Sequence, residues 1–186
     1  GTNWTEVNDL NTARNGLADS GTVTAALAFG GNTGSVTAVT ETWNGTNWTE
    51  VNDLNTARSA LAGAGDSNTV ALGFGGGPPN IAITESWNGT NWTEVNDLNT
   101  ARRALGGAGN YTSALAVGGN DGSLSGKTEE WNGTNWTEVS DLSTARAELG
   151  TTGTVPSALA FAGAAPSDSA ATEEWNSPQS VVKTLD

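Results

Sequence analysis

The sequence predicts an all-β fold built from four tandem units, each with four short antiparallel strands. Three observations lead to this prediction. Tryptophan recurs at an interval of 44 residues in two series, one from Trp4 to Trp136 and one from Trp43 to Trp175. Each unit contains four runs of β-type residues, and an Asn-Gly pair typical of a two-residue β-hairpin separates the last two runs in three units. A fixed period of this length is typical of stacked repeat architectures.

The repeat makes the 186 residues a single domain. The units span residues 12–55, 56–99, 100–143 and 144–186, after an opening segment at 1–11. In the first unit we expect strand a at 16–21, strand b at 25–31, strand c at 39–43 and strand d at 47–51. Tandem units of this kind predict a β-propeller of four blades with strand a innermost. A helix over residues 53–65 is the local alternative, which the glycine-rich end of that segment disfavours.

The two ends of the chain predict how the ring closes. Residues 1–11 contain a strand d without strands a to c, whereas the last unit has strands a to c and an atypical strand d. We therefore expect residues 3–7 to pair with residues 171–175, so that the N-terminal strand closes the four-bladed ring. Residues 180–185 are the alternative outer strand, since they need a shorter loop. We expect a monomer, and two chains forming one eight-bladed ring are the alternative assembly.

One unit, read as TAR…ALAFGG…TETWNGTNWTEV, resembles a kelch repeat. An Arg opens strand a, a Gly pair closes strand b, a Glu comes shortly before an aromatic residue on strand c, and a Trp lies on strand d. The strand c aromatic is Trp where the family usually has Tyr, and four copies are fewer than most kelch propellers use. The block WNGTNWTEVNDLNTAR is also similar to repeats in proteins of marine bacteriophages. These resemblances imply a propeller and suggest a virion or extracellular, host-surface setting.

The composition excludes several kinds of chemistry and of partner. The chain has 20 acidic and 7 basic side chains, a formal net charge of -13, and no His, Cys or Met. A thiol nucleophile, a disulfide framework, a histidine base and a Cys or His metal site are therefore ruled out. An acidic surface repels phosphate backbones and anionic headgroups, so we expect no nucleic-acid and no membrane partner. We also predict no cofactor and no metal.

Each unit carries one arginine and one glutamate at positions that do not vary between copies. On strand c, Glu41 shares a face with two tryptophans, and a carboxylate on a covered face needs a cation or several hydrogen-bond donors. We therefore expect one structural ion pair in each unit, while a ring of arginines that binds an anion is the alternative. The pairs are Arg14 with Glu41, Arg58 with Glu85, Arg102 with Glu129, and Arg146 with Glu173.

The copies differ mainly in the loop between strands b and c. Antiparallel connectivity places these b–c loops at the same end of the ring as the d–a loops, and the variable position after each repeat arginine should flank them. The candidate residues of this b–c loop face are Asn15, Asn32, Ser59, Asn80, Arg103, Asn120, Asp121, Lys127 and Asp168. Arg103 and Lys127 add positive charge to an otherwise acidic surface, which favours the third unit as the contact point. Neutral variation in exposed loops is the competing interpretation.

These patterns predict a non-catalytic binding or structural module, either a protein-interaction propeller or a virion or host-surface propeller. A glycan-binding lectin is the alternative, because tryptophan can stack on sugars, although the repeated placement on strands favours packing between blades. The aspartates that recur from Asp9 onward could hold calcium, but loop capping explains them. A hydrolase with two carboxylates is a distant third, because each invariant carboxylate has a structural explanation.

Overall fold

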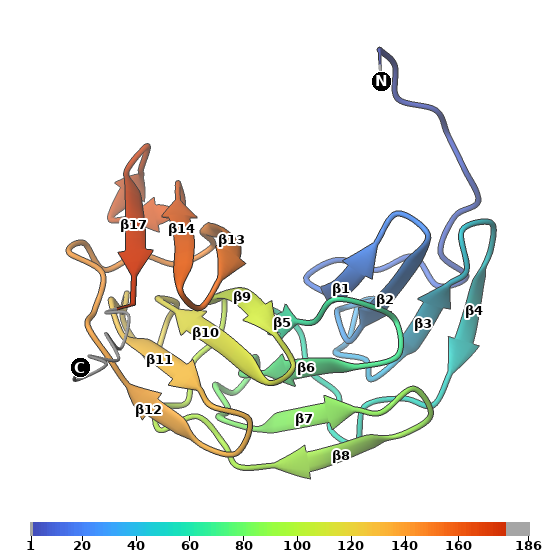
Figure 1. Cartoon of the computed structure of the whole chain (residues 1–186), viewed down its shortest axis with the longest axis horizontal. Coiled ribbons are helices and arrows are strands. Elements are labelled where there is room, and N and C mark those ends of the chain that lie inside the picture. Colours follow the sequence, from blue (N-terminus) through green and yellow to red (C-terminus); the bar gives the residue numbers. More distant parts are fainter. Residues whose placement is uncertain (1, 178–186) are drawn as a thin grey trace, which may run out of the picture.

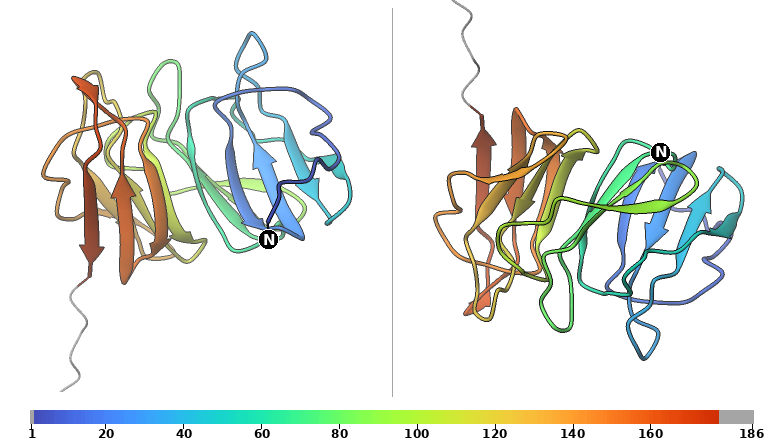
Figure 2. Two further views of the ribbon diagram at one scale, coloured as in Figure 1. Left: turned by 90° about the horizontal axis from the view of Figure 1, so that it is seen from above. Right: turned by 90° about the horizontal axis from the view of Figure 1, so that it is seen from below.

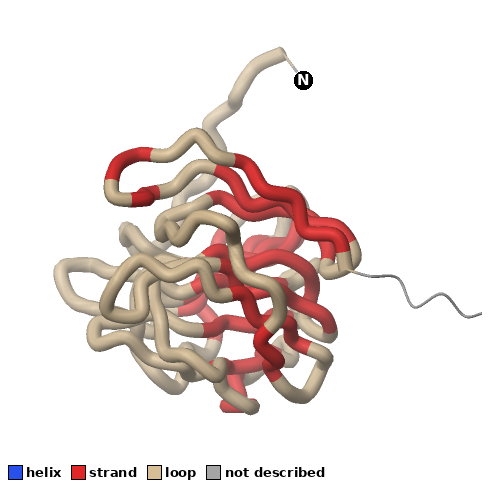
Figure 3. The backbone as a smooth tube through the Cα atoms, turned by 90° about the vertical axis from the view of Figure 1, so that its left-hand side faces the viewer, coloured by secondary structure: helices blue, strands red, loops and turns tan. Residues whose placement is uncertain are grey.

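The protein is a four-bladed β-propeller, as predicted (Figure 1). The computed structural model describes residues 2–177, and in this part of the chain it contains strands and loops but no helix (Figure 3). Among these residues, no helix has the length and apolar character needed to cross a membrane. The strands of each blade run between two opposite ends of the molecule, where the loops gather (Figure 2).

The blades follow one another along the chain, and in each blade the spatial order of the strands is their order in the sequence. The first blade contains β1 (Ala18–Thr22), β2 (Ala25–Phe29), β3 (Thr40–Trp43) and β4 (Trp48–Val51). The second contains β5 (Ala62–Ala64), β6 (Ala71–Phe74), β7 (Thr84–Trp87) and β8 (Trp92–Val95). The third contains β9 (Gly106–Asn110), β10 (Ser113–Val117), β11 (Thr128–Trp131) and β12 (Trp136–Glu138). The fourth contains β13 (Gly150–Thr154), β14 (Ser157–Phe161) and β17 (Thr172–Asn176), and its b–c loop forms the small hairpin of β15 (Ala164–Ala165) and β16 (Ser167–Asp168).

The hairpin between strands c and d is the predicted Asn-Gly turn. Trp43 and Trp48 pair across it, and Gly45 has a φ of 91°, a value that a β-carbon would disfavour. The Asn44 side-chain oxygen accepts the backbone N–H groups of Thr46 and residue 47, both at 2.9 Å. The same turn recurs in the next two units, so the sequence pattern fixes the register of the two outer strands in these blades.

Aromatic side chains join neighbouring blades. Trp92, on the outer strand of the second blade, has its ring centroid 4.8 Å from that of Phe29 in the first blade. Its indole N–H donates to the Thr40 hydroxyl of the first blade at 3.1 Å. Trp136 repeats both contacts on the second blade, with its ring centroid 4.9 Å from that of Phe74. Both tryptophans are buried, so the tryptophan of strand d ties its blade to the preceding one.

Backbone hydrogen bonds link the inner ends of the blades near the axis. The N–H of Ala60 donates to the Gly16 carbonyl, that of Ala104 to Ala60, and that of Glu148 to Ala104, at 2.7 to 2.8 Å. We call these four residues the axial ladder. All four have φ between 52° and 60°, which is unfavourable for alanine and glutamate. The hydrogen bonds to the next blade help to hold this conformation.

The ring is open between the first and fourth blades (Figure 1). Contacts between inner strands run from β1 to β5, from β5 to β9 and from β9 to β13. The predicted closure by the N-terminal strand is wrong, because residues 3–7 form no strand and Trp4 is fully exposed. Asn8 and Asn11 hold this segment on the first blade, across the gap from β17. The alternative outer strand at 180–185 lies outside the described residues.

Candidate functional site

In each unit, an ion pair holds the segment that leads into strand a against strands b and c of the same blade. In the first blade, an Arg14 guanidinium nitrogen bonds to the Glu41 carboxylate, and another donates to the Ala28 carbonyl of β2 at 3.1 Å. The Glu41 carboxylate also accepts the backbone and side-chain N–H groups of Asn11, at 2.7 and 2.8 Å. Neither charged side chain has exposed surface. The pair therefore holds strands b and c together with the segment that leads into strand a.

The same ion pair forms in the other three units. Arg58 pairs with Glu85, Arg102 pairs with Glu129, and Arg146 lies 2.8 Å from Glu173. The second and third pairs are fully buried, but the Glu173 side chain is 24% exposed, since β17 has no described outer strand beside it. The structural ion pairs are confirmed. The alternative of an anion-binding ring of arginines is not supported, because each guanidinium is buried against its own glutamate.

In the first and fourth units, the surroundings of the ion pair favour the charged form of its carboxylate. Burial raises the pKa of Glu41, but the hydrogen bonds from Arg14, Asn11 and Thr12 outweigh it, so the pKa lies below its ordinary value of 4.5. Burial also opposes ionisation of Glu173, yet the N–H of Ser143 and the charge of Arg146 hold its pKa below the ordinary value. The folded protein therefore binds protons at these sites more weakly than the unfolded chain does.

We expect the free energy of unfolding to fall as the pH drops below about 4.5. A carboxyl whose pKa is lowered by folding stabilises the protein fully above its unfolded pKa, and this stabilisation is lost as the pH falls through the folded pKa. Denaturant unfolding at a series of acidic pH values measures the loss. Glu41→Gln removes one of these carboxyls, so the free energy of unfolding of this variant should fall less steeply as the pH drops. An equally steep dependence in this variant would contradict the assignment.

The variable residues come together at one end of the blades. The residue after the repeat arginine pairs with the first residue of the b–c loop of its own blade, as Asn15 does with Asn32 and Arg103 with Asn120. In the second blade Ser59 pairs with Gly77 in the same way. The backbone N–H of each residue donates to the carbonyl of the other, at 3.0 and 2.9 Å. The d–a and b–c loops therefore share one face, as the connectivity predicted.

Three of the predicted contact residues form side-chain hydrogen bonds within the loops of this face. The side-chain oxygens of Asn32 and Asn120 accept the N–H of Gly34 at 2.7 Å and of Gly122 at 3.0 Å, so these side chains shape their own loops. The side chain of Asn80 donates to the Asn120 carbonyl at 2.9 Å and joins the second and third loops. Sequence reasoning missed these roles. The spacing of asparagine two residues before glycine is the signal that could have indicated the two turns.

The Ser59 hydroxyl donates to the Gly77 carbonyl at 3.1 Å, whereas three other predicted residues remain accessible to a partner. Asn15, Arg103 and Asp168 are exposed, and Asp168 lies on the β15–β16 hairpin. Asp121 and Lys127 form a half-buried ion pair of 3.7 Å. Arg103 and Lys127 both belong to the third unit, whereas the guanidinium groups of the four repeat arginines are buried. Accessible positive charge on this face is therefore concentrated in the third unit among the described residues.

The repeat aspartates cap strands and do not converge on one point. Asp53 accepts the backbone N–H of Thr40 at 3.0 Å, and Asp97 accepts that of Thr84 at 3.0 Å. Asp141 makes the equivalent bond in the third blade at 3.2 Å. Within residues 2–177, no group of three or more acidic side chains is placed to hold a metal ion. These contacts explain the aspartates without a calcium site.

The axis of the propeller holds a cavity of about 350 Å³, with walls from the inner strands of all four blades. Small residues such as Ala18, Gly63 and Gly106 line much of it, and Asp19 is its one charged lining residue. The tryptophans lie elsewhere. Trp43 and Trp87 are buried and donate their indole N–H groups to a–b loop carbonyls, whereas Trp48 is half-buried and Trp4 is fully exposed.

Comparisons with known proteins leave the family open. No protein-family model matches the chain, and no curated protein matches its sequence. The resemblances to kelch repeats and to bacteriophage repeats therefore stay predictions.

Proposed function

We propose that this protein is a non-catalytic binding module that holds a protein partner on its b–c loop face. The observation that supports this proposal is the contrast between a constant scaffold and variable loops. The ion pairs, the Asn-Gly hairpins and the axial ladder repeat from blade to blade with nearly the same distances. The b–c loops differ in every unit and lie together at one end. Rigid scaffolds that display variable loops commonly serve recognition.

The third unit is the part of this face that best suits a partner. The exposed Arg103 can form two parallel hydrogen bonds with a carboxylate, and Lys127 lies in the same unit. The formal net charge of -13 repels acidic partners over most of the surface. A partner segment that carries Asp or Glu would therefore bind off the axis, over the third loop.

Other functions have less support. A lectin would need an accessible aromatic face near the variable loops, whereas the tryptophans of the second and third blades are buried between strands and blades. A hydrolase would need two carboxylates free to act, but the repeat glutamates are held in ion pairs. A virion or host-surface setting agrees with the bacteriophage resemblance and stays a prediction.

A random peptide library selected on the immobilised chain tests the proposal, with a glycan array measured in parallel. We expect the selection to yield peptides that carry Asp or Glu and that bind Arg103→Ala at least about tenfold more weakly than the parent, because a charge-assisted pair is lost. Thr134→Ala, on the third Asn-Gly hairpin at the opposite end, is the matched control and should bind like the parent. Equal losses in the two variants, or ligands found on the glycan array alone, would contradict the proposal.

A further inference from the structure

We propose that the N-terminal strand of a second copy of this chain completes the fourth blade, so that copies join head to tail. In the described part of the chain, the fourth blade has three strands where the others have four. Residues 3–7, with the sequence Asn-Trp-Thr-Glu-Val, repeat the residues that form β4 and β8 but lie in no sheet. The proposal does not depend on a partner at the b–c loop face.

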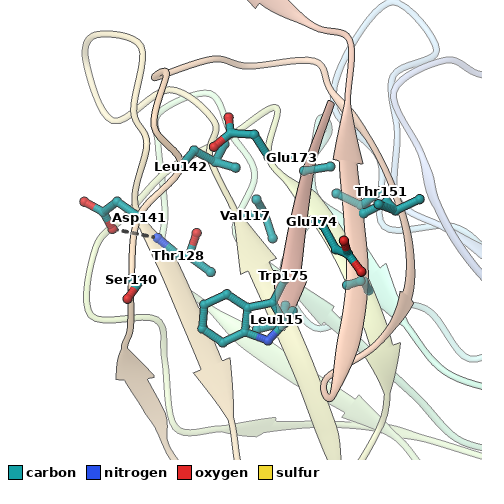
Figure 4. Close-up of a pocket in the computed structure, with 14 residues that line it drawn as sticks. Leu115, Val117, Thr128, Ser140, Asp141, Leu142, Thr151, Glu173, Glu174 and Trp175 are labelled. Atoms are coloured by element: carbon teal, nitrogen blue, oxygen red, sulfur yellow. Dashed lines mark hydrogen bonds between the residues drawn. The ribbon is translucent and has the colours of Figure 1, made fainter. Parts of the chain in front are cut away.

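A pocket lies between the third and fourth blades, at the place where the tryptophan of this strand would pack (Figure 4). Trp92 packs on Phe29 and Trp87, shares a buried cluster with Leu27 and Leu54 among others, and donates to the hydroxyl of Thr40. The residues at the equivalent repeat positions line the pocket: Leu115, Val117, Leu142, Trp175 and Thr128. The side chain that occupies the Trp92 position in the N-terminal strand is Trp4, which is fully exposed in the single chain.

The repeat also fixes how the donated strand would pair. In the first blade Trp43 lies opposite Trp48, and the same register places Trp4 opposite Trp175. The indole N–H of Trp4 would then donate to the Thr128 hydroxyl, as the indole groups of the second and third blades donate to the equivalent threonines at 3.0 to 3.1 Å. The strand would also cover the Glu173 side chain, which is 24% exposed without it.

The two ends of the open ring carry complementary halves of the junction between blades. The axial ladder ends at the Glu148 carbonyl in the fourth blade and at the Gly16 N–H in the first, so these two groups would continue it between copies. Phe161 is 40% exposed on the fourth blade, whereas the equivalent Phe29 and Phe74 are buried under the tryptophan of the following blade. A second copy that places its first blade there would cover Phe161.

The hydrogen bonds that attach the N-terminal segment to the first blade favour pairing of its strand with a second copy over pairing with its own fourth blade. The Asn8 side chain donates to the carbonyl of Thr46 at 3.0 Å and to the side chain of Asn47 at 2.6 Å. Asn52, directly after β4, makes the same two bonds to the second blade at 2.9 and 2.8 Å. The chain before Asn8 therefore leaves the first blade at the point from which β4 leaves the second blade, as the outer strand of a directly preceding blade would. The fourth blade of the same chain lies across the gap (Figure 1), and two chains joined in this way reciprocally would form one eight-bladed ring.

Disulfide formation between two single-cysteine variants tests the proposal, because the chain has no cysteine of its own. In the first blade Thr42 lies opposite Thr49, and the same register places Thr5 opposite Glu174. A mixture of Thr5→Cys and Glu174→Cys chains, after oxidation, should yield disulfide-linked heterodimers on a non-reducing gel, because paired strands bring the two sulfur atoms within bonding range. A mixture of Thr5→Cys and Thr33→Cys is the matched control, and it should yield few, since Thr33 lies in the b–c loop of the first blade.

A chain with both Thr5→Cys and Glu174→Cys shows whether the N-terminal strand pairs with a second copy or with the fourth blade of its own chain. Linked dimers support the proposal, whereas a disulfide within single chains alone would overturn it. Heterodimers no more abundant than in the control would also overturn it, and that is the result expected if residues 180–185 supply the outer strand. Trp4→Ala gives a second measurement. Because the Trp4 side chain is fully exposed in the single chain, its removal should leave the single chain folded. It should shift the mass in solution to that of one chain, and Thr2→Ala should not.

Discussion

Replacing Arg102 with alanine should lower the free energy of unfolding by about 3–5 kcal/mol, the usual cost of removing one partner of a buried ion pair. Arg102 is fully buried, bonds to Glu129, and donates to the Ala116 carbonyl at 3.1 Å. Without the guanidinium, the Glu129 carboxylate would stay buried with only the N–H groups of residues 99 and 100 as donors. Denaturant unfolding at neutral pH measures the loss.

Arg103→Ala is the matched control for this prediction. The two arginines are adjacent and carry the same charge, but Arg103 is exposed. Its replacement should change the free energy of unfolding by less than about 0.5 kcal/mol, as is usual for surface positions. If both variants lost the same stability, the cause would be the higher net negative charge of the chain, and the role given to the buried pair would be wrong.

Trp136→Ala should also lower the free energy of unfolding by about 3–5 kcal/mol. The side chain is buried between the second and third blades, where its ring packs on Phe74 and its N–H donates to the hydroxyl of Thr84 at 3.0 Å. Alanine would leave a cavity between the blades and remove the donor to a buried hydroxyl. Denaturant unfolding in dilute solution, where single chains dominate, measures the effect.

Trp48 provides the control for this second prediction. It holds the same repeat position in the first blade and packs on Trp43, with the ring centroids 5.4 Å apart, but no blade precedes it in its own chain. Trp48→Ala should therefore cost clearly less stability than Trp136→Ala in dilute solution. Equal losses would mean that the tryptophan stabilises its own blade and contributes little between blades.

The blades could be predicted from the sequence because their contacts depend on residues within one unit. The Asn44-Gly45 pair sets its own hairpin, and the spacing from Arg14 to Glu41 is the same in every copy. Observed β2, at Ala25–Phe29, falls inside the predicted strand b. The location of the variable face followed from connectivity alone. Repeat phase and turn chemistry were sufficient for these features.

Ring closure could not be predicted in the same way. It depends on the angle between neighbouring blades, and small differences in that angle add up over three junctions. The repeat indicates that Trp92 meets the preceding blade, but it does not give the angle at which the blades pack. The axial ladder was missed for a related reason, because alanine at residues 60 and 104 gives no sequence signal for positive φ. Glycine at position 16 was the single indication.

The mass of the protein in solution tests most directly the claim that the junction between blades continues from one copy to the next. Light scattering coupled to size-exclusion chromatography measures this mass without any change to the chain. We expect assemblies with the mass of two 18.8 kDa chains, and a shift toward single chains in Trp4→Ala. A parent protein that keeps the mass of one chain at every concentration up to its solubility limit would contradict it.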